Sequence, residues 1–230
     1  MFKDRLKTIL RGSPAGGTSV ASATLPARDN GSGMATGPAY TRHSNGLEQF
    51  FSSTRGQVGL NILDFAGASQ ANVSFITNLG HRLSSEDYLR SLEITFGNEK
   101  FYENQDDPEQ AQKFLDENLN FPPGHFDGAL VWDALQFLSP PLLDATVERL
   151  HTILRPGSSL LAFFHADEKA VQVPLYTYRI ADEKTLLLTP RGTRKRAQYF
   201  NNRGLEKLFH EQTVKFFLTR DNLREIIVRR

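Results

Sequence analysis

Apolar residues in the first half of the folded region form a strand, a tight turn, a helix and a second strand. Residues 58–65 are a short apolar run rich in strand formers, and the small residues of a turn follow them. Apolar positions then recur at helical spacing over residues 71–79, and Gly80 follows where a helix C-terminus favours glycine. Residues 82–85 form the next strand. This order predicts a βαβ unit with two parallel strands.

The same alternation returns further along the chain. Helices are predicted over residues 88–94 and 108–119, with no obvious third parallel strand in this interval. Residues 128–133 read as a buried strand that ends in an acid. A helix with a clean apolar stripe opens at Pro140 and Pro141, and a further apolar strand covers residues 159–164.

The C-terminal third has a different pattern. Two short strands, residues 176–180 and 185–188, flank a polar turn and predict a hairpin inserted near residues 174–190. Strands over residues 213–219 and 223–228 are joined by a connection short enough to require antiparallel pairing. We therefore expect an α/β fold of the doubly wound, Rossmann-like kind, mostly parallel, with a C-terminal antiparallel hairpin strand.

The N-terminal part differs from the rest. Residues 12–45 are rich in Gly, Ser, Ala, Thr and Pro, so we expect residues 1–45 to be a disordered tail and residues 46–230 to be the folded domain. A short helix near residues 47–51 is expected to cover the sheet edge. The first eleven residues have the pattern of a small basic amphipathic helix, too short to be stable alone. Its apolar side would carry Phe2, Leu6, Ile9 and Leu10, and its basic residues are Lys3, Arg5, Lys7 and Arg11.

Composition narrows the possible chemistry. The chain has 27 basic and 26 acidic residues, so bulk charge draws it neither to nucleic acid nor to a membrane. It has no cysteine, which excludes disulfides and thiolate chemistry and fits a cytoplasmic location. Its histidines show no spacing typical of metal ligands, and we predict no metal site.

Several separated motifs together resemble the class I S-adenosylmethionine-dependent methyltransferases. Leu63 and Asp64 match the start of the family's first-strand motif, and Asp87 follows 23 positions later, where the ribose-binding acid is expected. Residues 119–127 resemble the family's approach to its fourth strand, and residues 154–157 resemble the turn before its fifth. The resemblance covers about residues 46–230.

The resemblance implies S-adenosylmethionine as cofactor, methyl transfer to an unidentified acceptor, and a set of site residues. The glycine motif is degenerate, because its three glycines would fall at Ala66, Ala68 and Gln70, with Gly67 between them. Of these three residues, Gln70 is expected to interfere most with cofactor binding, because its long polar side chain would occupy space that a glycine leaves free. The implied cofactor-binding residues are Asp64, Ala66, Gly67, Ala68, Asp87, Asp116 and Trp132, and the candidate bases are Asp133 and His165.

Two other functions remain open. A methyltransferase-like scaffold without catalysis would act as an interaction module, gripping RNA or another polyanion through Arg191, Arg194, Lys195 and Arg196. Alternatively, Ser69 lies in a sequence similar to the nucleophile elbow of α/β-hydrolases, with Asp133 and then His165 or His210 in the right chain order. More ordinary roles compete with all of these assignments: strand-end acids often cap helices, and tryptophans are mostly buried.

Overall fold

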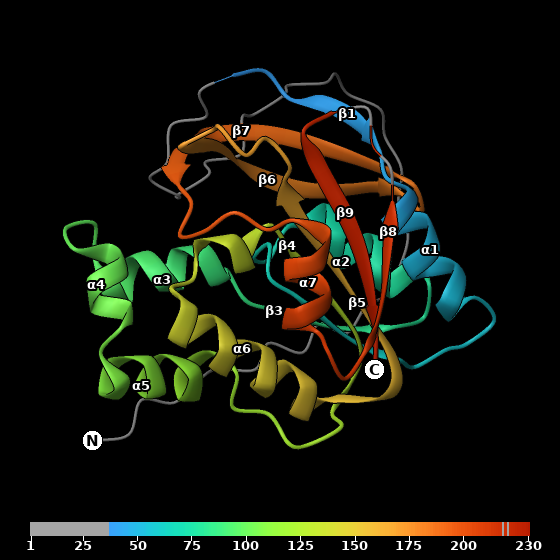
Figure 1. The fold of residues 1–230 in the computed structure, drawn as a ribbon. Coiled ribbons are helices and arrows are strands. Elements are labelled where there is room, and N and C mark those ends of the chain that lie inside the picture. Colours follow the sequence, from blue (N-terminus) through green and yellow to red (C-terminus); the bar gives the residue numbers. More distant parts are fainter. Residues whose placement is uncertain (1–36, 218, 220) are drawn as a thin grey trace, which may run out of the picture. The chain divides into compact units, whose positions relative to one another are not determined.

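The computed structural model describes residues 37–230 except 218 and 220, and the basic helix predicted over the first eleven residues lies outside them. A six-stranded sheet forms the centre, in the order β3-β2-β4-β5-β9-β8 (Figure 1). Its strands are β2 (Asn61–Asp64), β3 (Arg82–Ser85), β4 (Phe126–Trp132), β5 (Leu154–His165), β8 (Thr213–Phe217) and β9 (Leu223–Arg229).

The predicted fold class is confirmed. β3, β2, β4 and β5 pair in parallel, whereas β9 pairs antiparallel with both β5 and β8. Between β3 and β4 the described chain has no strand, and three helices occupy this interval: α3 (Tyr88–Phe96), α4 (Phe101–Gln105) and α5 (Pro108–Asn118). The first strand is shorter than predicted, because it begins at Asn61 and Val58 is 79% exposed.

The other helices are α1 (Asn45–Thr54), α2 (Gln70–Asn78), α6 (Pro140–Ile153) and α7 (Asn202–Leu208), and a 3₁₀ turn, η1, spans Ala134–Phe137. Helices cover both faces of the sheet: α6 and α7 lie on the near side in Figure 1, and α2 lies behind. The helix boundaries follow local rules. Pro108 and Pro140 open α5 and α6 at positions where no intrahelical N–H is needed, and Gly80 follows α2 with a φ of 82°.

A second sheet of three strands, in the order β1-β7-β6, was only partly foreseen. The predicted hairpin is longer than residues 174–190, with β6 at Gln172–Asp182 and β7 at Thr185–Lys195. β1 (Tyr40–His43) pairs antiparallel with β7, although these residues fall in the stretch predicted to be a disordered tail. Their pairing partner lies more than 140 residues away, so no local pattern could announce this strand.

Buried ionic contacts tie β1 to the central sheet. Arg42 donates to the carboxylate of Glu225, which is fully buried on β9, and its Nε lies 2.7 Å from Asp221. Glu225 also accepts from Ser44 Oγ at 3.0 Å and from Gly46 N at 2.5 Å, so it satisfies the start of α1. α1 packs against β5 and β9. Both are inner strands of the central sheet, so the helix does not cover the sheet edge as expected.

The core is one continuous apolar cluster between the sheet and its helices. Close packing explains one glycine in a strand: a Cβ on Gly128 of β4 would lie 2.7 Å from Cζ of Phe50. Among residues 37–217, 219 and 221–230, no helix is long and apolar enough to cross a membrane. The same residues contain no cluster of His, Asp and Glu that could hold a metal ion.

Candidate functional site

Two side chains meet where β2 and β4 end. The indole Nε1 of Trp132 donates a hydrogen bond of 2.6 Å to Oδ1 of Asp64, and Ala66 N donates to the same oxygen at 2.9 Å. The other oxygen, Oδ2, accepts from Asn72 Nδ2 at 2.8 Å. Asp64 is fully buried, and burial raises its pKa while these three donors oppose the shift. The carboxylate is therefore held by groups within the protein.

Trp132 has an unusual backbone conformation. Its φ is 53°, in the left-handed region that bulky residues rarely adopt. The hydrogen bond to Asp64 holds one edge of the indole, and the ring stacks on Tyr178 of β6 with centroids 4.9 Å apart and planes 8° apart. Backbone strain at the carboxyl end of a parallel strand is typical of functional sites.

The β6–β7 hairpin lies against this place and is tied to it through Asn72 of α2. Asn72 Nδ2 contacts Tyr178 O at 3.3 Å, and its Oδ1 accepts from Ile180 N at 2.8 Å. Because Nδ2 also donates to Asp64, one buried amide joins β2, α2 and β6. Asn72 and Tyr178 were missed at the sequence level, since only the packing of a distant hairpin gives them a role.

The turn after β2 lies next to Asp87. Ala66 and Asp87 form an isolated antiparallel bridge, and Gly67 adopts a φ of 78°. A Cβ on Gly67 would lie 3.0 Å from Cβ of Asp87 in a conformation that other residues rarely adopt, so this position requires glycine. Asp87 also caps α3 through a hydrogen bond of 3.2 Å from Arg90 N. Asp87 therefore both caps α3 and lies beside the turn, as each of the two sequence interpretations expected.

Gln70 does not fill the space beside this turn. It is the first residue of α2, its side chain is exposed, and its Nε2 donates to Ser74 Oγ at 2.8 Å. Ser69 caps the same helix by accepting from Asn72 N at 3.1 Å. The two histidines considered for a hydrolase have other partners: His165 Nδ1 contacts Gln136, and His210 Nε2 lies 3.7 Å from Glu211.

A small polar cavity lies beneath the hairpin. Its volume is about 20 Å³, and its lining includes Trp132, Asp133, Tyr176, Tyr178 and Arg191. Within the described part of the chain, Oδ2 of Asp133 and Nε of Arg191 are buried without a hydrogen-bond partner, and the buried Tyr178 hydroxyl lies close to Asp133. Burial raises the pKa of Asp133 to about 7, although the charge of Arg191 and the nearby Tyr178 act to lower it. Buried polar groups of this kind make the cavity a candidate functional site.

His165 ends β5 beside the same hairpin. Its Nδ1 lies 2.8 Å from Gln136 Nε2, and its ring stacks 6.3 Å from that of Tyr176. Burial lowers the pKa of His165 to about 4, and the neighbouring charge of Arg196 lowers it further. The imidazole is therefore neutral at physiological pH and has one unpartnered ring nitrogen, Nε2, among the described residues.

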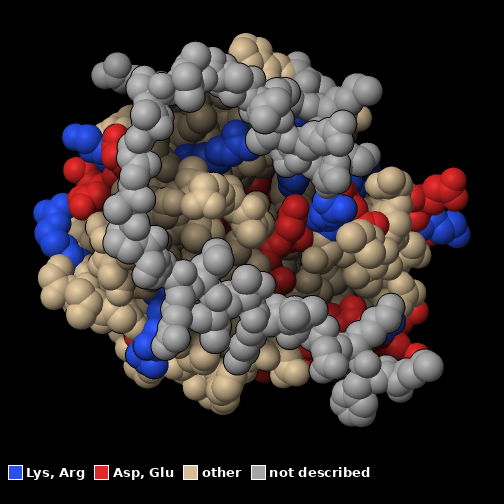
Figure 2. Space-filling model, turned by 180° about the vertical axis from the view of Figure 1, so that it is seen from behind, with Lys and Arg blue, Asp and Glu red and all other residues tan. Residues whose placement is uncertain are grey.

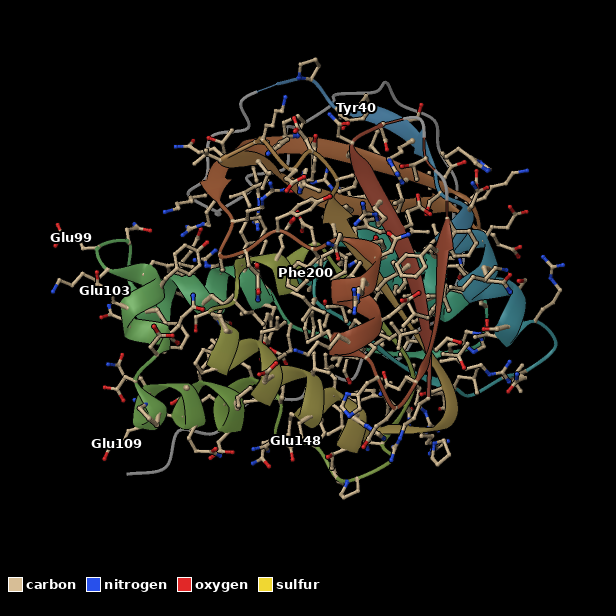
Figure 3. All side chains as sticks on the ribbon, viewed as in Figure 1. Tyr40, Glu99, Glu103, Glu109, Glu148 and Phe200 are labelled. Atoms are coloured by element: carbon tan, nitrogen blue, oxygen red, sulfur yellow. The ribbon has the colours of Figure 1, made fainter. Side chains whose placement is uncertain are left out.

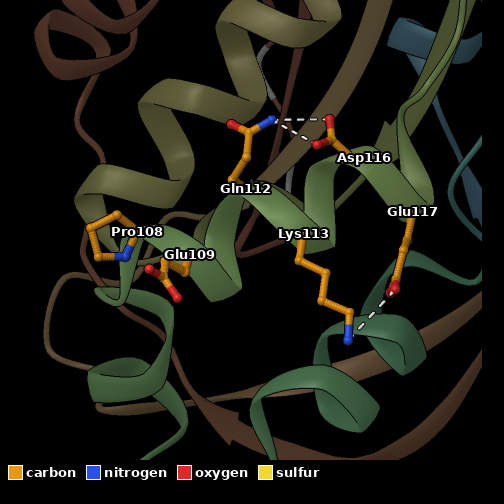
Figure 4. Close-up of a pocket in the computed structure, with 6 residues that line it drawn as sticks. All are labelled: Pro108, Glu109, Gln112, Lys113, Asp116 and Glu117. Carbon is orange, nitrogen blue, oxygen red and sulfur yellow. Dashed lines mark hydrogen bonds and ion pairs between the residues drawn. The ribbon is translucent and has the colours of Figure 1, made fainter.

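Asp116 lies elsewhere, on the outer surface of α5. It accepts two hydrogen bonds from Gln112 Nε2, at 3.0 and 2.9 Å (Figure 4). Asp116 accepts a third hydrogen bond, of 3.1 Å, from Arg149. The shallow hollow that it lines consists of residues from α5 alone. None of the strand-end residues lines that hollow.

The four basic residues predicted to contact a polyanion have separate environments. Arg196 is 7% exposed and donates to backbone carbonyls of residues 165, 167 and 168. Arg194 pairs with Glu93 at 2.5 Å and lies over the ring of Phe101, Arg191 faces the cavity, and Lys195 is exposed. Basic and acidic side chains are mixed on the uncovered part of the face in Figure 2. Polyanion contact stays a prediction.

No protein-family model and no curated protein sequence matches the chain. Solved structures that resemble it include several S-adenosylmethionine-dependent methyltransferases. One from Archaeoglobus fulgidus has 10% identity and a TM-score of 0.48, with 80% of this chain and 91% of that chain covered. One from Methanosarcina mazei has 15% identity and a TM-score of 0.45, with 77% and 95% covered.

A third is the 1,6-didemethyltoxoflavin-N1-methyltransferase of Burkholderia thailandensis, solved with 1,6-didemethyltoxoflavin and S-adenosylhomocysteine. It has 12% identity and a TM-score of 0.42, with 79% of this chain and 74% of that chain covered. At such low identities and TM-scores the likeness assigns no activity to this chain.

Proposed function

We propose that the chain binds S-adenosylmethionine at the carboxyl ends of β2 and β3 and transfers its methyl group to an acceptor. The observation that carries this proposal is the bridge between Ala66 and Asp87, which brings the turn after the first parallel strand against the acid after the second. Ligands of open α/β sheets bind at such strand ends. Gly67 lies between them at a position where a Cβ would crowd Asp87.

The residues present supply part of what the cofactor needs. In this proposal Asp87 would accept hydrogen bonds from ribose hydroxyls, and the backbone of residues 66–68 would line the ligand. The cofactor, when bound, supplies a methyl group activated by a sulfonium. Asp133 and His165 come from the ends of neighbouring strands β4 and β5, which makes both candidates for contacting the acceptor.

The space does not fit the cofactor as the side chains are arranged. The cavity at these strand ends is about 20 Å³, whereas sites for molecules of this size enclose roughly 300–1,000 Å³. Asp64 is also occupied by Trp132, Ala66 and Asn72. We therefore derive no catalytic step, and the proposal requires the β6–β7 hairpin to move away from Trp132 before the cofactor enters.

Isothermal titration with S-adenosylhomocysteine tests the proposal. We expect micromolar binding by the unaltered chain and weaker binding by Asp87→Ala. Asp107→Ala is the matched control, because Asp107 caps α5 as Asp87 caps α3 but has no place at the strand ends. Equal weakening by both variants would show that a lost helix cap, not a lost ribose contact, explains the effect.

A second function, a scaffold that binds no cofactor, is favoured by one specific observation. Both oxygens of Asp64 are satisfied within the protein, and the stacked Trp132 and Tyr178 fill the adjoining space. The Tyr178→Ala variant separates the two functions, because it removes the ring that covers Trp132. A scaffold gives no heat with S-adenosylhomocysteine in either protein.

A further inference from the structure

The last residues of β7 contact α3 and α4. The guanidinium of Arg194 pairs with the Glu93 carboxylate on α3 at 2.5 Å. Its Cζ also lies 4.4 Å from the centroid of the Phe101 ring on α4. The Tyr102 hydroxyl, on the same helix, donates a hydrogen bond to the carbonyl oxygen of Lys195. Figure 1 shows the head of the β7 arrow on the same side of the molecule as these two helices. The end of the hairpin is therefore joined to helices that lie outside it.

These contacts lie beside the cavity at the strand ends. Leu89 of α3 and Arg191 of β7 both line that cavity. Glu93 follows Leu89 by one turn of α3, and Arg194 follows Arg191 by three residues on β7. The pair of Glu93 and Arg194 therefore joins two of the elements that form the cavity wall.

The joined groups are only partly shielded from solvent. The side chains of Arg194 and Glu93 are 18% and 41% exposed, and salt weakens an ion pair in such a position. Tyr102 contributes an uncharged bond. Burial raises its pKa to about 12 against the opposing charge of Arg194, so the hydroxyl keeps its proton and donates. Contacts of this modest strength can break while the rest of the fold stays intact.

Elsewhere the hairpin is attached through buried groups. Near its turn, β1 pairs with residues 185–188 of β7, and Arg42 of β1 bonds to the buried Glu225. After β7, Arg196 is 7% exposed and donates to backbone carbonyls at and just after the end of β5. Breaking buried polar contacts costs far more than breaking a partly exposed pair. We expect the contacts with α3 and α4 to release before these.

We propose that Glu93, Tyr102 and Arg194 form a latch that holds the β6–β7 hairpin closed over the strand ends and controls ligand entry there. The role in ligand entry rests on the proposed binding of S-adenosylmethionine, whereas the closing of the hairpin does not. Salt weakens the latch, so the fraction of open molecules rises with ionic strength.

Fluorescence of Trp132, the single tryptophan of the chain, reports the closure directly. Trp132 is 2% exposed beneath the hairpin, so acrylamide reaches its ring when the hairpin opens. We expect Arg194→Met and Tyr102→Phe each to raise the quenching constant by about threefold, as the loss of a modest contact does. Glu103→Gln is the matched control and should leave the constant unchanged. Glu103 lies on the outer side of α4 with a side chain 74% exposed (Figure 3).

Salt dependence separates the ion pair from a general loosening of the fold. From about 0.05 to about 0.5 M sodium chloride, the quenching constant of the unaltered chain should rise and that of Arg194→Met should stay constant. Glu93→Gln is a conservative change that keeps the test available if Arg194→Met does not fold, and it should behave in the same way. Unchanged quenching in every folded variant of the latch would overturn the proposal. So would a salt dependence equal to that of the unaltered chain in the variants that lack the ion pair.

Titration with S-adenosylhomocysteine then tests the role in entry. A bismaleimide cross-link between the new residues of Glu93→Cys with Arg194→Cys locks α3 to β7, and the absence of other cysteines directs the reagent to this pair. We expect cross-linking to abolish the binding that the double variant shows beforehand. Equal binding before and after cross-linking would overturn the role in entry. No heat in either state, with quenching raised in Arg194→Met, would contradict the proposed cofactor and still support the latch.

Discussion

Trp132 donates its indole hydrogen to Asp64 across the ends of two parallel strands, at a distance of 2.6 Å. The buried carboxylate of Asp64, at the end of β2, therefore fixes the position of the indole ring. Because Trp132 also stacks on Tyr178, the β6–β7 hairpin is closed over the strand ends by the same residue that occupies Asp64. The position of the β6–β7 hairpin and the hydrogen bonding of Asp64 are therefore coupled through Trp132.

Removing the indole donor should destabilise the fold. Trp132→Phe keeps a ring but leaves Asp64, which is fully buried, with one donor fewer. A hydrogen bond to a charged group contributes about 1.5–3 kcal/mol, so the free energy of unfolding should fall by about that amount. Urea unfolding followed by circular dichroism measures it, and an unchanged midpoint would mean that the bond contributes nothing to stability.

The ion pair of β1 should matter far more than an exposed pair. Arg42→Met leaves Glu225 buried without its cation, and breaking a buried pair costs about 3–5 kcal/mol. Arg55→Met is the control, because Arg55 and Glu183 are 69% and 43% exposed, and such a surface pair contributes about 0–1 kcal/mol. Similar losses in the two variants would contradict the described anchoring of β1.

Asp133 should make stability depend on pH in a defined window. Its folded pKa is raised to about 7, above the ordinary value of about 3.9. The unfolded chain therefore releases this proton first, and stability falls as the pH rises from about 4 to about 7. The Asp133→Asn variant lacks this contribution. The difference in the free energy of unfolding between the two proteins should therefore change from about pH 4 to about pH 7 and level off above pH 7. A constant difference would show that Asp133 ionises normally.

His165 should act with the opposite sign. Its folded pKa is lowered to about 4, below the ordinary value of about 6.5. The unfolded chain takes up the proton first, so stability falls as the pH drops from about 6.5 to about 4. His165→Gln should lose this slope, and retention of the wild-type slope would contradict the burial of the imidazole.

The sequence predicted those parts of the fold that depend on neighbouring residues. Residues 82–85 form β3 as expected, Pro108 opens α5, and the final two strands pair antiparallel. These features follow from apolar runs, caps and short connections. β1 escaped notice because its partner is β7, and the hairpin extends beyond the predicted bounds through further pairing between β6 and β7.

The candidate site was predictable to a smaller extent. The sequence pattern placed Asp64 and Asp133 at the ends of apolar runs and Asp87 after the second predicted strand. Gln70 drew attention as an obstacle, yet it begins α2 and faces solvent. The groups that close the site, Trp132 and Tyr178, meet across 46 residues of sequence, and single-sequence patterns carry no information on such contacts.

Titration of S-adenosylhomocysteine into the unaltered chain and into Tyr178→Ala tests the central claim most directly. If closure by the hairpin limits cofactor entry, affinity is reduced by the fraction of molecules that are open. The account predicts micromolar binding by the unaltered chain and binding about tenfold tighter by Tyr178→Ala. No heat from either protein at high concentration would contradict it and leave the non-catalytic scaffold as the function of this fold.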